Sequence, residues 1–336
     1  MAVRAAAQFR RTPRRLVPGV RRAFAPIQEA RGFAKAMLWI GAAITVFFAV
    51  LAVFAPLLSP YRFDQYQANG HRFAQLARPS ADHWMGTTVQ SVDVMARVIY
   101  GTQTELKVVL LALVFSLSIG VPIGVTSGYF GGWLDRVLVL VMDALFAFPY
   151  LLLAIVIAFV LQAYVASGVF TAAAAITVVY IPQYFRVVRN HVISVREEPY
   201  VEAARALGAK PFTIMRRYIF FNVVQNVPVI ATLNAADAIL TLAGLGFLGY
   251  GIQPNDGAEW GYDIQRAVSD ATSGIWWTGL FPGLAIVLLV TGLTLLGEGL
   301  NETINPVLRR RRIEKVELEA RLAHEPTPVI DEAAGL

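Results

Sequence analysis

Residues that commonly carry chemistry are few in this chain, and their spacing does not fit catalysis or metal binding. The chain has no Cys, which excludes disulfides, zinc–cysteine sites, iron–sulfur clusters and thiol nucleophiles. No two of its four His residues lie within four positions of each other. None of its Lys residues follows Gly, as the phosphate-binding sequence G-x-x-x-x-G-K-[ST] requires. We therefore expect no catalytic residue, no metal, no cofactor and no ATP site in this chain.

Two acidic residues are unusual because they lie inside long apolar runs. A charge near the centre of a bilayer costs about 2.5–3.5 kcal/mol, so Asp143 and Asp237 are expected to face a protein interior or an aqueous path. They could relay protons, line a hydrated cavity or make polar contacts between packed helices. Neither has a His partner, and we expect no Arg at matching depth, so a relay is not favoured. We assign both as possible pathway-lining residues.

The composition indicates the kind of protein that must position these residues. The 336 residues are 56% hydrophobic and 15% charged, with a mean hydropathy of +0.55. Globular domains are about 45–50% apolar and about 25% charged. Because an apolar run of about 20 residues can cross a bilayer as a helix, we predict an all-α membrane protein with six transmembrane helices. The predicted helices are 37–58, 106–129, 134–160, 170–192, 223–248 and 280–300.

Lys and Arg are distributed unevenly among the segments that separate these helices. Alternate segments hold 23 of them on one side of the membrane and 5 on the other, and the positive side is cytoplasmic. Both termini are therefore predicted to be cytoplasmic, with a basic N-terminal segment at 1–36 and a tail at 307–336. The predicted extracytoplasmic segment is 59–104, and the predicted core at 105–306 contains a cytoplasmic loop at 195–222.

The predicted outward segments carry a modest acidic surface. Five Arg residues lie in the same segments, so we expect the balance to be too even to select a strongly charged solute by its field. The residues expected on this surface are His83, Asp93, Asp256, Glu259, Asp263 and Asp270.

The cytoplasmic loop has the pattern of a helix, a turn and a second helix. Pro199 suits the first position of a helix, Gly208 suits the left-handed residue that ends one, and Pro211 opens the next. One apolar face is predicted at helical spacing from Tyr200, Ala203 or Ala204, and Leu207. A helix of two turns is too short to be stable alone in water. It could dock into another protein or lie on the lipid surface, and periodicity leaves both open.

The same loop resembles a known signature. Glu202-Ala203-Ala204, three residues and Gly208 are similar to the EAA-x-x-x-G sequence in the membrane subunits of binding-protein-dependent ABC importers. The family usually continues to Ile-Leu-Pro, whereas this chain has Ile219-Phe220-Phe221. The resemblance implies that the first helix couples to an ATP-binding subunit. The residues expected to couple are Tyr200, Glu202, Ala203, Ala204, Arg205, Leu207 and Gly208.

Further stretches narrow the resemblance to the second permease of dipeptide and oligopeptide importers. His83-Trp84-Met85-Gly86-Thr87 and the run from Leu245 to Pro254 are similar to that subfamily. This resemblance implies a type I (MetI-like) permease core with an extra N-terminal helix, in the bacterial cell membrane. The implied partners are the lipid bilayer, a homologous permease, an extracytoplasmic substrate-binding protein, and one or two ATP-binding subunits that carry ATP and Mg. No nucleic-acid partner is expected.

Two alternatives remain open at this stage. A permease of the same family could carry nickel, a sugar or haem in place of a peptide. A secondary transporter would be driven by ions or protons, and such proteins often contain two related halves. We find no second copy of any motif in this sequence. Co-purification of an ATPase subunit would distinguish an ABC permease from the other classes.

Overall fold

The structure of the chain is a computed structural model that describes residues 33–165 and 168–304. Residues 31–300 form one compact unit, and it contains the candidate sites. Most of the predicted basic segment at 1–36 and the whole predicted tail at 307–336 lie outside the described residues.

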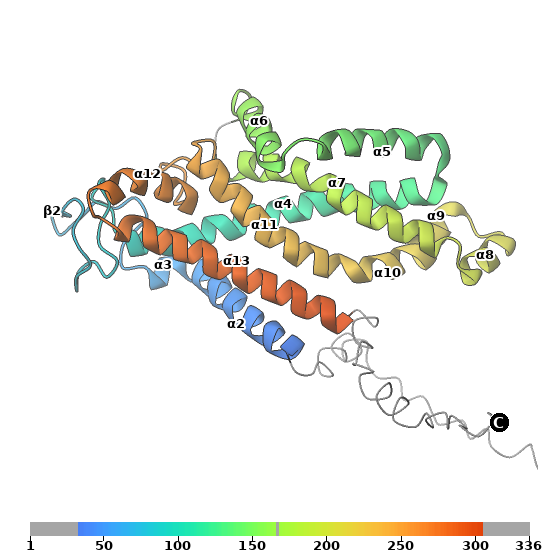
Figure 1. Cartoon of the computed structure of the whole chain (residues 1–336), viewed down its shortest axis with the longest axis horizontal. Coiled ribbons are helices and arrows are strands. Elements are labelled where there is room, and N and C mark those ends of the chain that lie inside the picture. Colours follow the sequence, from blue (N-terminus) through green and yellow to red (C-terminus); the bar gives the residue numbers. More distant parts are fainter. Residues whose placement is uncertain (1–32, 166–167, 305–336) are drawn as a thin grey trace, which may run out of the picture. The chain divides into compact units, whose positions relative to one another are not determined.

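The described part of the chain is largely helical (Figure 1). The long helices are α2 (Phe33–Val53), α4 (Val94–Phe130), α7 (Val169–Val195), α11 (Val227–Phe247) and α13 (Trp277–Ile304). The shorter ones are α3 (Ala55–Leu58), α5 (Gly132–Phe146), α6 (Tyr150–Gln162), α8 (Pro199–Ala206), α9 (Pro211–Ile214), α10 (Phe220–Val223) and α12 (Trp260–Thr272). A π-helical turn (Met215–Ile219) and a 3₁₀ turn (Val224–Asn226) flank α10, and β1 (Gln67–Ala68) pairs antiparallel with β2 (His71–Arg72).

Five of these helices are long and apolar enough to cross a membrane, and the number is six if the bent pair of α5 and α6 counts as one span. The expectation of one continuous helix at 134–160 is wrong, because α5 and α6 are bent by 94°. Figure 1 shows the two helices running in different directions. Pro149 has no N–H to bond the carbonyl of Leu145, and its ring disfavours a helical conformation at Phe148. The bend follows from this proline.

Helix α4 begins at Val94, well before the predicted start at 106. Asp93 precedes it with an extended backbone, and its carboxylate accepts a hydrogen bond of 2.7 Å from the backbone N–H of Ala96, which satisfies one free donor of the first turn. The polar residues 102–105 hid this part of the helix from a search for apolar runs. Glu105 therefore lies inside α4, where it is fully buried.

The packing of α4 against α7 depends on three glycines spaced four residues apart. A Cβ on Gly120 would lie 3.0 Å from the carbonyl oxygen of Ile181, and one on Gly124 would lie 2.9 Å from that of Phe185. A Cβ on Gly128 would lie 2.9 Å from the carbonyl oxygen of Arg189. Small residues at this spacing let two membrane helices approach backbone to backbone.

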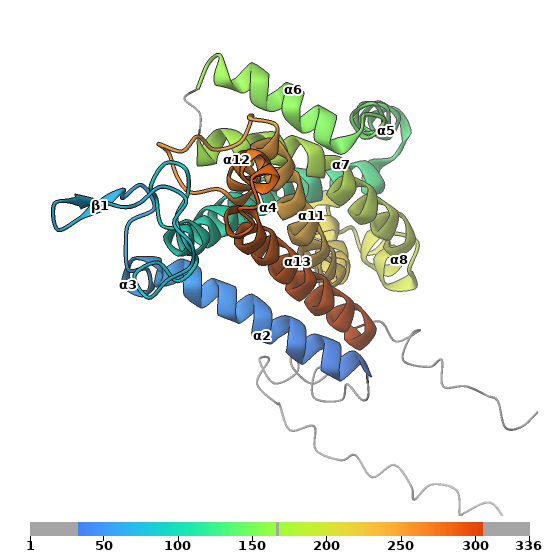
Figure 2. The same ribbon diagram turned by 60° about the vertical axis from the view of Figure 1, so that its left-hand side comes forward.

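The N-terminal helix α2 lies beside α13 in both ribbon views (Figures 1 and 2). Gly41 of α2 leaves no room for a Cβ against the backbone at Leu296, and Gly292 of α13 meets the side chain of Ile44. The predicted extra helix ahead of the core is therefore present, and close packing on α13 holds it in place.

Candidate functional site

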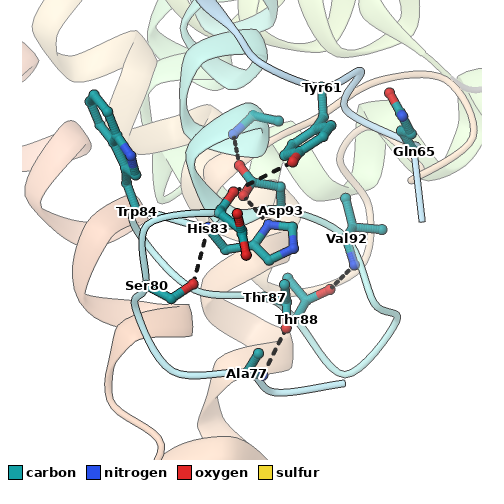
Figure 3. Close-up of polar contacts among 12 residues, drawn as sticks. Tyr61, Gln65, Ala77, Ser80, His83, Trp84, Thr87, Thr88, Val92 and Asp93 are labelled. Carbon is teal, nitrogen blue, oxygen red and sulfur yellow. Dashed lines mark hydrogen bonds and ion pairs between the residues drawn. The ribbon is translucent and has the colours of Figure 1, made fainter. Parts of the chain in front are cut away.

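The end of the molecule that carries the hairpin and α12 is stabilised by buried polar groups. His83 Nδ1 lies 2.8 Å from the carboxylate of Asp93, and Figure 3 shows the two side chains pointing toward each other. The rings of Tyr61 and Phe73 pack beside the imidazole, with centroids 5.4 and 4.7 Å from it. Because Asp93 also caps α4, this cluster fixes the segment before α4 to the start of that helix.

A second buried group joins α12 to α4. Arg97 pairs with Asp263 at 2.6 Å, and both side chains are less than 10% exposed. Glu259 caps α12 by accepting hydrogen bonds of 2.7 Å from the N–H groups of Gly261 and Tyr262. Burial raises the pKa of Glu259 to about 7, and the charge of Asp263 adds to the rise.

The expectation of an acidic surface on the outward segments is therefore wrong. Of the six residues assigned to it, only Asp256 is exposed, whereas His83, Asp93, Glu259, Asp263 and Asp270 are buried. Asp93 and Glu259 cap helices, and Asp263 pairs with Arg97. A carboxylate directly before a helix can bond its free N–H groups, but no helix start is predicted from the sequence at Val94 or Trp260, so this signal was missed.

At the opposite end of the long helices lies α8, between α7 and α9 (Figure 1). Pro199 occupies its first turn, as expected. Gly208 has φ +81°. Its N–H donates a hydrogen bond to the carbonyl oxygen of Arg205, and the N–H of Ala209 donates one to the carbonyl oxygen of Ala204. This pair of bonds is the Schellman motif, which needs a left-handed residue at the position of Gly208.

Helix α8 buries one narrow side and exposes the rest. Val201 is buried in the cluster that contains Ile214 and Ile219. Ala204 is also buried, so it does not belong to an exposed face. The remaining residues expected to couple lie on the surface, and the side chain of Leu207 is 88% exposed. The exposed residues are Tyr200, Glu202, Ala203, Arg205, Leu207 and Gly208.

Hydrogen bonds tie this end of α7 and α8 to three other helices. The hydroxyl of Tyr200 accepts a hydrogen bond of 3.0 Å from Asn222 of α10. Arg196, the residue that ends α7, donates to the carbonyl of Gly128 in α4 at 2.8 Å. Arg189 of α7 holds the carboxylate of Asp135 in α5 with two hydrogen bonds, of 2.5 and 2.7 Å. Sequence reasoning missed these contacts, because the partners are far apart in the chain.

The two membrane acids lie in different surroundings. Asp143 of α5 pairs with Arg186 of α7 at 2.9 Å, so the expectation that no Arg lies at matching depth is wrong. Arg186 lies within helix α7 rather than in the loop that follows it. Asp237 of α11 lines a cavity beside the α5–α6 bend. Both acids are exposed on the surface of this chain.

Comparisons with known proteins match most of the chain. The family described as the inner membrane component of binding-protein-dependent transport systems matches residues 120–310. The N-terminal transmembrane domain of oligopeptide transport permease C matches residues 31–79, which include α2.

Several relatives are similar over most of their length. The dipeptide transport system permease protein DppC of Alkalihalophilus pseudofirmus is 36% identical over 80% of this chain and 86% of its own. The glutathione transport system permease proteins GsiD of Pectobacterium atrosepticum and Escherichia coli are 32% and 33% identical. They cover 83% and 81% of this chain, and 90% and 87% of their own.

A solved structure has the same fold. A chain of the MetNI methionine ABC transporter matches with a TM-score of 0.51 and 20% identity, over 63% of this chain and 98% of its own. The MetI-like core predicted from the sequence is thereby confirmed, with α2 as an addition ahead of it. On the family match and the identity to its relatives, this chain belongs to the permease family of ABC importers, the inner membrane components of binding-protein-dependent transport systems.

Proposed function

We propose that this chain is one of two homologous permease subunits of an importer for di- or oligopeptides. A substrate-binding protein delivers the peptide on the outer side, and separate subunits that bind ATP and Mg drive its passage. The relatives named for dipeptide and glutathione transport support the peptide class. The exposed helix α8 is the observation that supports coupling to ATP-binding subunits.

Helix α8 has the properties that a coupling element needs. Its exposed side offers apolar Leu207 and Tyr200 beside charged Glu202 and Arg205. Its contacts with α10, and those of α7 with α4 and α5, make it move with the long helices. When ATP draws the partner subunits together, a rigid α8 transmits the motion and shifts the permease between inward-open and outward-open states. Each state is stabilised only by contacts that differ between the two.

This mechanism requires both termini and α8 to be cytoplasmic, in the inner membrane of a bacterium. The chain has no Cys, so single cysteines report the topology without background. A cysteine at Lys210 should be labelled only from the cytoplasm, and one at Asp256 only from outside. External labelling at Lys210 would contradict the proposed coupling, because α8 would then lie on the wrong side.

Co-purification and uptake test the proposed function. Gly208→Val places a β-branched residue at a positive φ, which costs about 1–2 kcal/mol, and should misalign α8. Glu202→Ala should remove a charge partner, and both variants should lose the ATPase subunit and ATP-driven uptake of labelled Ala-Ala. Gly70→Val is the matched control, because Gly70 also has a positive φ (+80°) and open space around it, in the distant hairpin. Uptake that follows a proton gradient without ATP would instead favour a secondary transporter.

A further inference from the structure

A cavity of about 320 Å³ lies at the break between α5 and α6, which is within the size range of small-ligand sites. Its walls come from the bend and from α7 and α11, which are far apart in the sequence. Non-helical backbone at membrane depth is tolerated where it lines a cavity or is buried in protein. Six of the lining side chains are aromatic or carry an oxygen that can accept a hydrogen bond: Phe146, Phe148, Tyr150, Tyr180, Gln183 and Asp237.

Asp237 lies halfway along α11, ten residues from each end. At a rise of 1.5 Å per residue, this places it roughly 15 Å from either end of the helix, near the centre of a bilayer. Within residues 33–165 and 168–304, its carboxylate forms no ion pair and accepts no hydrogen bond. A carboxylate at this depth needs a cation or water.

The other polar groups of the cavity also accept hydrogen bonds. Oε1 of Gln183 is buried and has no partner among the described residues. The hydroxyl of Tyr180 lies 3.3 Å from that of Thr241, and Tyr150 is 59% exposed beside the bend. An ammonium group has three N–H donors and no acceptor, so it complements these groups.

The aromatic rings and the nearby charges favour the same ligand. Aromatic faces attract cations within about 6 Å of the ring centroid, and Arg186 already lies 4.2 Å from the centroid of Phe146. That guanidinium is paired with Asp143 at 2.9 Å, which leaves Asp237 as the acid in the cavity lining without a countercharge.

We propose that this cavity binds the amino-terminal ammonium group of a peptide in transit, with Asp237 as its countercharge and Gln183 as a second acceptor. The proposal rests on the proposed function, because it assigns the substrate contact within a peptide permease. Every unmodified peptide carries this group whatever its sequence. A single ammonium site can therefore hold many peptides and leave the choice among them to the binding protein.

Direct binding tests the site without requiring transport. Equilibrium dialysis would measure ¹⁴C-labelled n-butylammonium on the purified complex of both permeases and the ATPase subunits, without binding protein. We expect saturable binding that Ala-Ala displaces and that n-butanol and NaCl do not. Asp237→Asn and Gln183→Leu should weaken it, the former by about tenfold as for the loss of a charge pair. Asp64→Asn is the matched control, because Asp64 is an exposed acid that does not line the cavity, and it should bind as the wild type does.

Three results would overturn the site: no saturable binding, equal binding by Asp237→Asn, or displacement by NaCl, which would indicate an inorganic cation. Co-purification of the ATPase subunit with each variant shows that its fold is intact. ATP-driven uptake of labelled Ala-Ala by the wild-type complex with its binding protein is measured in parallel. Absence of that uptake would contradict the proposed peptide function, whereas normal uptake without Asp237-dependent binding would contradict the site alone.

Discussion

The acids beside α12 and the start of α4 differ from Asp143 and Asp237 in a way that reverses the usual expectation. Asp93, Glu259 and Asp263 lie in segments outside the spans, yet they are buried and hold helices together. Asp143 and Asp237 lie within spans, yet they are exposed on the surface of this chain. A buried acid with partners stabilises a fold, whereas an exposed acid at membrane depth must be satisfied by something outside the chain. The comparison therefore separates acids that hold the fold together from the two that we propose to line the substrate path.

The largest expected effect is the loss of Arg97. Arg97→Met would leave Asp263 buried without its partner, and breaking one side of a buried ion pair costs about 3–5 kcal/mol. Arg266→Met is the control, because Arg266 is exposed on the same helix as Asp263, and it should change stability by less than about 0.5 kcal/mol. Tryptophan-fluorescence unfolding in detergent would measure both. Equal effects would show that the pair of Arg97 and Asp263 does not stabilise the fold.

The same comparison shows which features of this molecule could be predicted from its sequence. The spans, the start of α8 at Pro199 and the left-handed Gly208 follow from local patterns of apolar residues, proline and glycine. The buried pairs could not be predicted, because Arg97 and Asp263 are joined only by the packing of α12 on α4. The same holds for Arg186, which the count of loop charges assigned to a loop although it lies within α7. Side-chain partners across helices need the tertiary arrangement.

The second effect is a pH dependence that arises from Glu259. Its pKa of about 7 exceeds the ordinary 4.5, so the folded protein holds a proton that the unfolded chain releases between these values. The stability that Glu259 contributes is therefore fully present below about pH 4.5 and is lost as the pH rises to about 7, by on the order of 3 kcal/mol. Glu259→Gln should flatten this fall in unfolding curves, whereas exposed Glu202→Gln should not. A wild-type protein that gained stability over this range would contradict the burial of Glu259.

A third effect separates the two sides of α8. Val201 is fully buried and Leu207 is 88% exposed, although both are apolar residues of the same short segment. Val201→Ser should lower the free energy of unfolding by about 1–3 kcal/mol, because it buries a hydroxyl and leaves a cavity. Leu207→Ser should leave stability unchanged and reduce retention of the ATPase subunit. The opposite assignment would mean that the buried side of α8 faces the partner.

The smallest effect concerns the exposed pair of Asp143 and Arg186. Their side chains are 57% and 44% exposed, so the environment outside the chain decides how much the pair contributes to stability. In a hydrated path, the coupling energy from a double-mutant cycle should be about 0.2–1 kcal/mol, as for pairs in water. The cycle compares Asp143→Asn, Arg186→Gln and the double variant by unfolding of the assembled permease. If the pair faced lipid, desolvation would make the loss of one partner far more costly. A coupling energy above about 2 kcal/mol would therefore place this side of α5 in a dry environment and restrict the hydrated path to the side of Asp237.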